Sequence, residues 1–355
     1  MIVNNRCTDT QLLEFWNLLD MTASAIERAR EKELKEYGLS TVQGKVLISL
    51  WILDHDPTLG ELSNWLFREQ SSTSCITEKM ASKGLIRKYM DPVKKLMTRI
   101  AMTEKGENEL NKIVSREALL KILSELTREE CLHLRDCLKN MISHTKAEAD
   151  IRHGSPDAQL MVNCILELCG GKDSNAGIIP DIQIKGINQR HLLQDIMYSY
   201  CTPDQFIVWV YLDQARYTIS RAITMELRKY GLSLIQNKVL STLSVMHHHP
   251  TLGDLAMWLF REHNSTSGIT DRMARKGLIE KYQDPFKKHL TRVSITENGR
   301  QANLDVLKMG NVQRILSFLT PEECEQVKYL LGKLFAKAIV VAGLKNQINL
   351  DKLIY

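Results

Sequence analysis

Two stretches of sequence decide the fold, STSCITEKMASKGLI at residues 72–86 and STSGITDRMARKGLI at residues 265–279. They lie 193 positions apart, and the same offset aligns residues 37–106 with residues 230–299 at 42 identities in 70 positions without a gap. Two copies indicate a tandem duplication of one domain, because a solenoid array needs more repeats than two. We therefore expect the chain to contain one domain twice.

Caps, glycines and hydrophobic periodicity predict the same order of elements in each copy. In copy 1 the expected elements are a long helix at 8–37, a helix at 40–53, a short helix capped by Thr58, a helix at 72–83, strands at 85–88 and 98–102, and helices opening at Thr103 and Thr127. In copy 2 the long helix is expected to start at the Thr202-Pro203-Asp204-Gln205 cap and to end near Tyr230, with later caps at Thr251 and Thr320. Gly38 and Gly231 suit the left-handed position that stops a helix. A helix, a short helix, a turn, a second helix and a two-stranded tip form a winged helix-turn-helix.

At these residues the sequence resembles the MarR family of bacterial and archaeal transcription regulators. The resemblance lies in the core Ser-Thr-Ser-x-Ile-Thr-x-x-Met-Ala-x-Lys-Gly-Leu-Ile, in the Asp-Pro-x-Lys-Lys tip and in the closing Thr-Glu-Lys-Gly, and it covers both copies, about 270 of 355 residues. It implies a mainly α fold with small β wings (α+β), with tandem winged helix-turn-helix domains joined through a helical dimerisation-like body. It also implies sequence-specific binding of double-stranded DNA.

The expected domain organisation follows from the repeat. We assign residues 1–150 to copy 1, residues 151–200 to a partly helical linker with a short helix at 157–168, residues 201–345 to copy 2, and residues 346–355 to a C-terminal tail. Family members are homodimers whose first and last helices interlock over a palindromic operator. The resemblance therefore implies a single-chain pseudo-dimer that reads two half-sites, with further self-association left open.

The charge of the chain is concentrated in two places. The net charge is +5, and residues 68–99 carry +5 while residues 261–292 carry +4, so the remainder is acidic. Two basic patches are the electrostatic footprint of a nucleic-acid binder, and a solvated basic face is the alternative. With 44% hydrophobic and 25% charged residues and no apolar run long enough to span a bilayer, the composition indicates a soluble cytoplasmic protein without a membrane partner. Eight cysteines without a CxxC pair are expected to be reduced thiols.

The second helix of a helix-turn-helix lies in the major groove, so its residues divide between a buried face and a base-facing one. Helical spacing places Thr266, Ile269, Thr270 and Met273 on the buried face. The candidate DNA-reading residues share the opposite face: Ser71, Ser72, Ser74, Cys75, Lys79 and Ser82 in copy 1, and Asn264, Ser265, Ser267, Gly268, Arg272 and Arg275 in copy 2. The acidic residues there, Glu78 and Asp271, are expected to pair with the neighbouring Lys79 and Arg272 rather than to read cytosine.

The wings supply the candidate phosphate contacts, which are Lys94, Lys95, Arg99, Lys287, Lys288 and Arg292. The family usually has Asp-Pro-x-Asp-Arg-Arg in the wing, whereas this chain has Lys-Lys-Leu at 94–96 and Lys-Lys-His at 287–289. The usual Asp-to-Arg pair that stiffens the tip is therefore expected to be absent. This departure keeps open an alternative function, a protein-interaction module such as an antirepressor, whose winged domains no longer bind DNA.

The two copies differ mainly on the groove-facing side. The buried positions are identical, whereas Ser71, Cys75, Glu78, Lys79 and Ser82 are replaced in copy 2 by Asn264, Gly268, Asp271, Arg272 and Arg275. Drift of exposed residues is one explanation, and different half-site preferences are the other. The second explanation predicts an imperfect palindrome as the operator.

Other chemistry is not expected. No phosphate loop, nucleophile elbow or paired-carboxylate motif occurs, so we expect no enzyme and no cofactor. His247-His248-His249 is interpreted as a polar loop rather than a metal site. Cys75 is interpreted as an ordinary small residue, with a redox switch as the alternative, whereas Cys131, Cys324, Trp65, Trp258, Phe67 and Phe260 are predicted core residues. The resemblance implies a small-molecule effector between the helical body and the winged domains.

Overall fold

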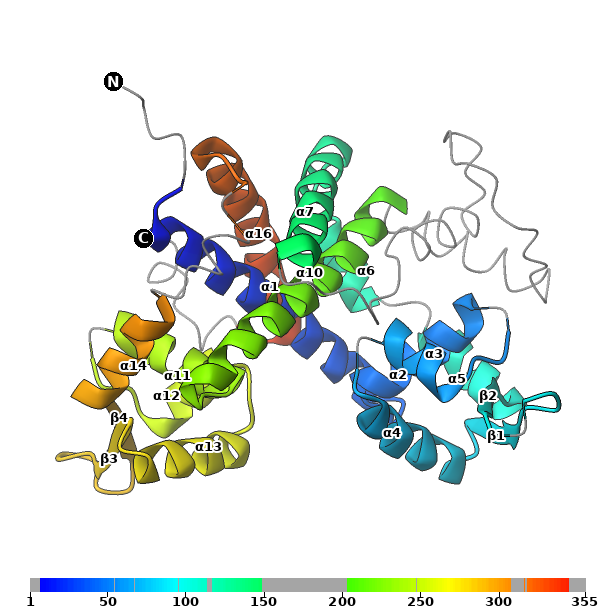
Figure 1. Ribbon diagram of the computed structural model, residues 1–355, viewed down its shortest axis with the longest axis horizontal. Helices are drawn as coiled ribbons and strands as arrows, with labels where there is room; N and C mark the ends of the chain where they lie inside the picture. Colours follow the sequence, from blue (N-terminus) through cyan, green and yellow to red (C-terminus); the bar gives the residue numbers. More distant parts are fainter. Residues whose placement is uncertain are drawn as a thin grey trace. The chain divides into compact units, whose positions relative to one another are not determined.

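The computed structural model describes residues 7–53, 55–66, 68–94, 96–113, 117–148, 203–246, 248–307, 316 and 318–344 (Figure 1). The predicted linker helix at 157–168 and the tail at 346–355 lie outside these residues, as do Phe67, Lys95 and His247. The chain divides into two compact units. Unit 1 consists of Met1–Ala25, Cys137–Asp150 and Ala215–Tyr355, and unit 2 consists of Ile26–Asp136 and Ile151–Gln214. Each unit therefore combines the winged domain of one copy with helical segments of the other copy.

The predicted class, mainly α with small β wings, is confirmed. Copy 1 contains α1 (Asp9–Lys35), α2 (Thr41–Ile52), α3 (Leu59–Trp65), α4 (Gln70–Ser82), β1 (Ile86–Met90), β2 (Thr98–Met102), α5 (Glu104–Ile113), α6 (Glu117–Leu123) and α7 (Arg128–Glu148). Copy 2 contains α10 (Pro203–Leu227), the 3-10 helix η1 (Arg228–Tyr230), α11 (Leu234–Val245), α12 (Leu252–Trp258), α13 (His263–Arg275), β3 (Ile279–Gln283), β4 (Thr291–Ile295), α14 (Glu297–Leu307) and α16 (Pro321–Ala342). Each wing is a two-stranded antiparallel sheet, with Ile86 opposite Met102 and Ile279 opposite Ile295.

Local signals explain where these helices begin and end. Reciprocal capping boxes are formed by Ser40, Thr58, Ser233, Thr251 and Thr320, as hydroxyl residues followed three positions later by an acid or an amide should do. Gly38 and Gly231 follow the long first helices with φ of 68° and 66°, a conformation that disfavours other residues. The helix α6 was not among the predicted elements, because its seven residues EALLKIL, five of them buried, are too few for periodicity to distinguish a helix from a strand.

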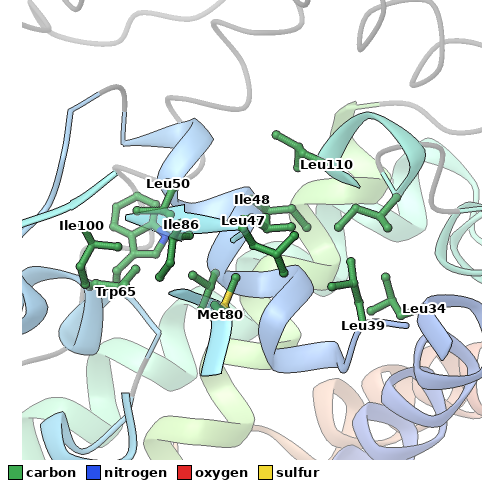
Figure 2. Packing of buried hydrophobic residues seen from close by; sticks show 14 residues of the cluster. Leu34, Leu39, Leu47, Ile48, Leu50, Trp65, Met80, Ile86, Ile100 and Leu110 are labelled. Atoms are coloured by element: carbon green, nitrogen blue, oxygen red, sulfur yellow. The ribbon is translucent and has the colours of Figure 1, made fainter. Parts of the chain in front are cut away.

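The core of the winged domain of copy 1 joins α2, α3, α4, the wing strands and α5 (Figure 2). Trp65, predicted to be in the core, is buried against it, as are Met80 and Ile100. In copy 2 the prediction was wrong for Trp258 and Phe260, which are half-buried. Phe260 has a positive φ of 51° and turns its ring edge-on to Phe335 of α16, at 6.1 Å between ring centroids. The turn between α12 and α13 thus directs this ring toward a helix rather than into the winged core.

Ion pairs connect the first helix of one copy with the second helix of the other. In unit 1, Asp20 of α1 accepts hydrogen bonds from Arg216 Nε of α10, at 3.0 Å, and forms an ion pair with Lys238 of α11. In unit 2, the equivalent Asp213 accepts hydrogen bonds from Lys45 Nζ of α2 at 2.9 and 3.0 Å. The two carboxylates occupy the same position of the repeat, and so do the two lysines. Each copy therefore contributes a carboxylate to the unit that holds the winged domain of the other copy.

The two ion-pair sites are expected to differ in their contribution to stability. Burial opposes ionisation of Asp20, but Lys238 and Arg216 outweigh it and lower the pKa of its carboxyl. The side chain of Asp20 is 12% exposed and that of Asp213 is 33% exposed. We expect Asp20→Asn to lower the free energy of unfolding by about 2–3 kcal/mol, because it removes the partly buried carboxylate that Lys238 and Arg216 both bind. The matched control Asp213→Asn should cost about 1 kcal/mol or less in urea unfolding, and equal losses would contradict the assignment.

Candidate nucleic-acid interface

The helices α4 and α13 divide into two faces as predicted. Thr266, Ile269, Thr270 and Met273 are buried, and so are Thr73, Thr77 and Met80 in copy 1, whereas Ile76 is half-buried. The buried threonine hydroxyls are satisfied within the helix: Thr270 Oγ1 donates to the carbonyls of Thr266, at 3.0 Å, and Ser267, at 2.9 Å. A threonine-rich inner face therefore packs without leaving a polar group unpaired.

The predicted DNA-reading residues lie at the surface of these two helices. Ser71, Cys75, Lys79, Ser82, Asn264, Ser265, Arg272 and Arg275 are exposed, and Ser72, Ser74, Ser267 and Gly268 are half-buried. Several hydroxyls have local partners: Ser74 Oγ donates to Glu78 at 3.0 Å, and Arg261 donates to Ser265 Oγ at 3.1 Å. The structure thus brings the predicted set onto one exposed face in each winged domain.

The predicted pairing of the acidic residues was wrong. Asp271 accepts a hydrogen bond from Lys281 Nζ of β3 at 2.6 Å, and Glu78 lies 3.8 Å from Lys88 Nζ of β1. The hydrogen bond from Lys281 is the main cause that lowers the pKa of Asp271. Adjacent residues on a helix point in different directions, so Arg272 and Lys79 cannot meet these carboxylates as readily as a lysine from the packed strand can. The signal that could have revealed them was available, because both lysines recur at equal positions of the repeat.

A clamp holds each wing tip through residues other than those of the usual Asp-Arg-Arg motif, whose places are taken by Lys-Lys-Leu and Lys-Lys-His. Asp284 Oδ1 accepts the backbone N–H groups of Phe286 and Lys287, both at 2.8 Å, and Asp284 Oδ2 accepts the Nε–H of Arg292. Arg292 also donates to the carbonyl of His249 at 2.6 Å. We call this arrangement the wing clamp.

Copy 1 forms the same wing clamp. Asp91 Oδ1 accepts from the backbone of Val93 and Lys94 at 2.8 and 2.7 Å, and Arg99 binds both Asp91 Oδ2 and the carbonyl of Asp56. The predicted phosphate contacts Arg99 and Arg292 are therefore engaged in holding the wings together. Lys94, Lys287 and Lys288 are exposed on the wing tips, and Lys95 lies outside the described residues.

Removing the wing clamp is expected to loosen the tip without unfolding the unit. Asp284→Ala should abolish the hydrogen-exchange protection of the Phe286 and Lys287 amides, because both lose their acceptor. Asp284→Asn is the matched control, since its amide oxygen can still accept from the backbone although it loses the charge that binds Arg292. Unchanged protection in Asp284→Ala would show that other contacts hold the tip.

The clamp also predicts a dependence on pH. The backbone N–H of Lys94, followed by the Arg99 guanidinium, lowers the pKa of Asp91 to about 2. Because the folded pKa lies below the ordinary value of about 3.9, the contribution of the clamp to stability is complete above that value. It should be lost as the pH falls through about 2, which amide exchange of the copy 1 tip between about pH 4 and 2 would measure.

The cysteines and the candidate metal ligands complete the set of predicted sites. Cys75 is exposed on α4, whereas Cys131 and Cys324 are buried, as predicted. Among the described residues no group of three or more His, Cys, Asp or Glu could hold a metal ion. A search of the same residues finds no helix long and apolar enough to cross a membrane.

Comparisons with known proteins agree with the resemblance. No family model matches the chain. Over 124 residues it is 26% identical to the uncharacterized HTH-type transcriptional regulator YfiV of Bacillus subtilis (strain 168), which covers 34% of this chain and 76% of that protein. One similar solved structure is a MepR–DNA complex from S. aureus, which is 23% identical, covers 31% of this chain and 83% of its own, and has a TM-score of 0.29. Another is a mutant MarR from E. coli complexed with operator DNA, which is 24% identical, covers 32% of this chain and 83% of its own, and has a TM-score of 0.30.

Each of these matches has about the length of one copy. The curated relative is named as an HTH-type transcriptional regulator. This name agrees with the helix-turn-helix part of the predicted resemblance, over the length of a single copy.

Proposed function

We propose that the chain is a sequence-specific regulator of transcription that binds double-stranded DNA through two winged helix-turn-helix heads. The observation that carries the proposal is the division of α4 and α13, each with a fully packed inner face and an outer face of hydroxyls, lysines and arginines. Small hydroxyls and amides can bond bases or phosphates, and the exposed Arg275 can reach the O6 and N7 atoms of guanine. The similarity to an HTH-type regulator supports the same function.

The proposal includes a single-chain pseudo-dimer with the copies at residues 1–150 and 201–345. It is supported by the crossed ion pairs Asp20–Lys238 and Asp213–Lys45, since each winged domain is bonded to the first helix of the other copy. One chain can then supply both heads and the helices that support them. The small-molecule effector implied by the family resemblance belongs to the same proposal.

The operator is proposed to be an imperfect palindrome. The outer faces differ at Ser71/Asn264, Cys75/Gly268, Glu78/Asp271, Lys79/Arg272 and Ser82/Arg275, whereas the inner faces are identical. Base edges are read by the outer set, so the half-sites should have different sequences, with centres about 10 base pairs or a multiple of that apart.

Selection of bound duplexes from a random pool, followed by light scattering of the complex, tests the function and the stoichiometry. We expect one chain to occupy one site of roughly 20 base pairs, the span of two half-sites. Two chains per site would exclude the pseudo-dimer, and failure to recover any duplex would favour a protein-interaction module instead.

Exchange of the five outer residues between the copies tests the half-site assignment. The exchanged protein should prefer the opposite orientation of an asymmetric site, because each outer face would have moved to the other head. A change of preference can be measured by competition between the two orientations in a flanked duplex. Indifference to orientation in both proteins, with preference for a perfect palindrome, would show that the divergence carries no sequence information.

A further inference from the structure

Both wing tips present large apolar side chains to solvent. Phe286 is 94% exposed at the tip of copy 2, and the equivalent Val93 is 86% exposed at the tip of copy 1. Leu96, in the same loop as Val93, is 99% exposed. Single exposed apolar residues are common on protein surfaces, but here an apolar residue stands at the same position of both wings. Exposed lysines flank it in each case, Lys94 in copy 1 and Lys287 and Lys288 in copy 2.

Backbone hydrogen bonds hold the loops that carry these side chains. Besides the wing clamp, the Asp284 N–H donates to the carbonyl of Leu290 at 2.9 Å, and the Leu290 N–H donates to that of Lys287 at 2.8 Å. Asp91, Met97 and Lys94 repeat these two bonds in copy 1, both at 2.8 Å. The backbone therefore fixes where Phe286 and Val93 project, and their exposure does not result from an unpaired loop.

The wings are also tied to the helices proposed to enter the major groove. The Lys281–Asp271 ion pair joins β3 to the exposed face of α13. The Lys88–Glu78 ion pair joins β1 to the exposed face of α4 in the same way. If α13 occupies a major groove, the Lys281–Asp271 pair holds the hairpin beside that groove, next to the sugar-phosphate backbone that separates it from the minor groove. The tip lysines can then bind phosphates, whereas Phe286 can bury apolar surface only against the sugars and the stacked bases.

We propose that the wing tips are apolar wedges, Phe286 in copy 2 and Val93 with Leu96 in copy 1, which enter the minor groove and partly unstack a base step. Apolar side chains flanked by basic residues insert in this way in proteins that bend DNA. The partner is a polyanion with an apolar interior, which matches lysines around an apolar tip better than an apolar protein pocket does. The inference rests on the proposed DNA-binding function and adds that the bound duplex is bent.

The test uses the full chain and a duplex recovered by selection, with 2-aminopurine placed at successive positions and a fluorophore at each end. Binding should raise the 2-aminopurine fluorescence at one step in each flank and bring the ends closer together. Phe286→Ala should remove the signal in one flank, and Val93→Ala with Leu96→Ala should remove it in the other. Phe286→Leu should preserve it, because leucine is also a wedge residue. The affinity of the alanine variants for the duplex should fall by no more than about tenfold. Each variant loses the apolar contact with the bases, but it also avoids the free-energy cost of unstacking them.

Lys287→Ala is the matched control, since it removes a charge from the same tip and should reduce affinity while keeping the unstacking signal. Binding without a 2-aminopurine signal, or a signal that survives in Phe286→Ala, would overturn the wedge and leave the DNA-binding function standing. Failure to bind any duplex would overturn both the wedge and the proposed DNA-binding function. Because Phe286, Val93 and Leu96 have almost no contacts, thermal melts of their variants should match that of the unchanged chain.

Discussion

Raising the salt concentration from about 50 to 200 mM should weaken binding to duplex DNA by roughly 10³- to 10⁵-fold. This range corresponds to neutralisation of about six to ten phosphates. Each neutralised phosphate releases condensed counterions into solution, and a higher salt concentration makes that release less favourable. The structure supplies cations for such contacts: Lys79, Lys94, Arg272, Arg275, Lys287 and Lys288 are exposed, and all belong to the recognition helices or the wings. Fluorescence anisotropy of a labelled duplex across the salt range measures the effect.

The wing lysines provide the control for this prediction. Replacing Lys94, Lys95, Lys287 and Lys288 by Ala should weaken binding to selected and random duplexes by similar factors and should flatten the salt slope. If affinity for random duplexes were unchanged while specific affinity collapsed, these lysines would read bases. Binding that does not respond to salt would instead support the alternative of a protein-interaction module.

Gly299→Ala is expected to cost about 3 kcal/mol of stability, because overpacking at a rigid contact forces the backbone to move. A Cβ at Gly299 of α14 would lie 2.0 Å from the carbonyl oxygen of Leu278 and 2.9 Å from Ile295 Cγ1. The neighbour is backbone rather than the end of a flexible side chain, so rotation cannot relieve the clash. Gly106 of α5 has the same environment, at 2.1 Å from the carbonyl oxygen of Leu85.

Gly332→Ala is the matched control for the glycine prediction. Gly332 lies within α16, and a Cβ there would meet no atom within 4 Å. Alanine should stabilise that helix by about 0.5–1 kcal/mol, since it loses less conformational entropy on folding. Thermal unfolding followed by circular dichroism should therefore move in opposite directions for the two variants, and a melt of Gly299→Ala like that of the unchanged chain would refute the steric argument.

The features that the sequence predicted correctly are those decided within a few residues. The caps at Thr58 and Thr251 and the left-handed Gly231 depend on neighbours one turn away, and the inner face of α13 follows from helical spacing. These are the interactions that propensity and periodicity describe.

The features that were missed depend on segments brought together by folding. The partner of Asp271 lies on a strand, and the wing clamp of Asp284 closes with an arginine on the far side of the hairpin. Phe260 leaves the core because α16 offers it a ring partner. A charged residue in a sequence specifies the kind of partner it needs but not which of several candidates the chain brings near.

The mixed composition of unit 1 has a consequence for how the chain is made. Thr22 Oγ1 donates to the carbonyl of Leu331 at 3.3 Å, and Cys7 Sγ donates to that of Leu319 at 3.5 Å, although more than 300 residues separate the partners. During translation the apolar side of the N-terminal half of α1 must therefore wait for α16, which is synthesised about 300 residues later. Contacts between such distant residues slow folding. Until they form, the apolar surface of α1 is exposed and can bind chaperones or other nascent chains. Synthesis of α16, rather than synthesis of copy 1, should be the event that completes the unit to which the N-terminal half of α1 belongs.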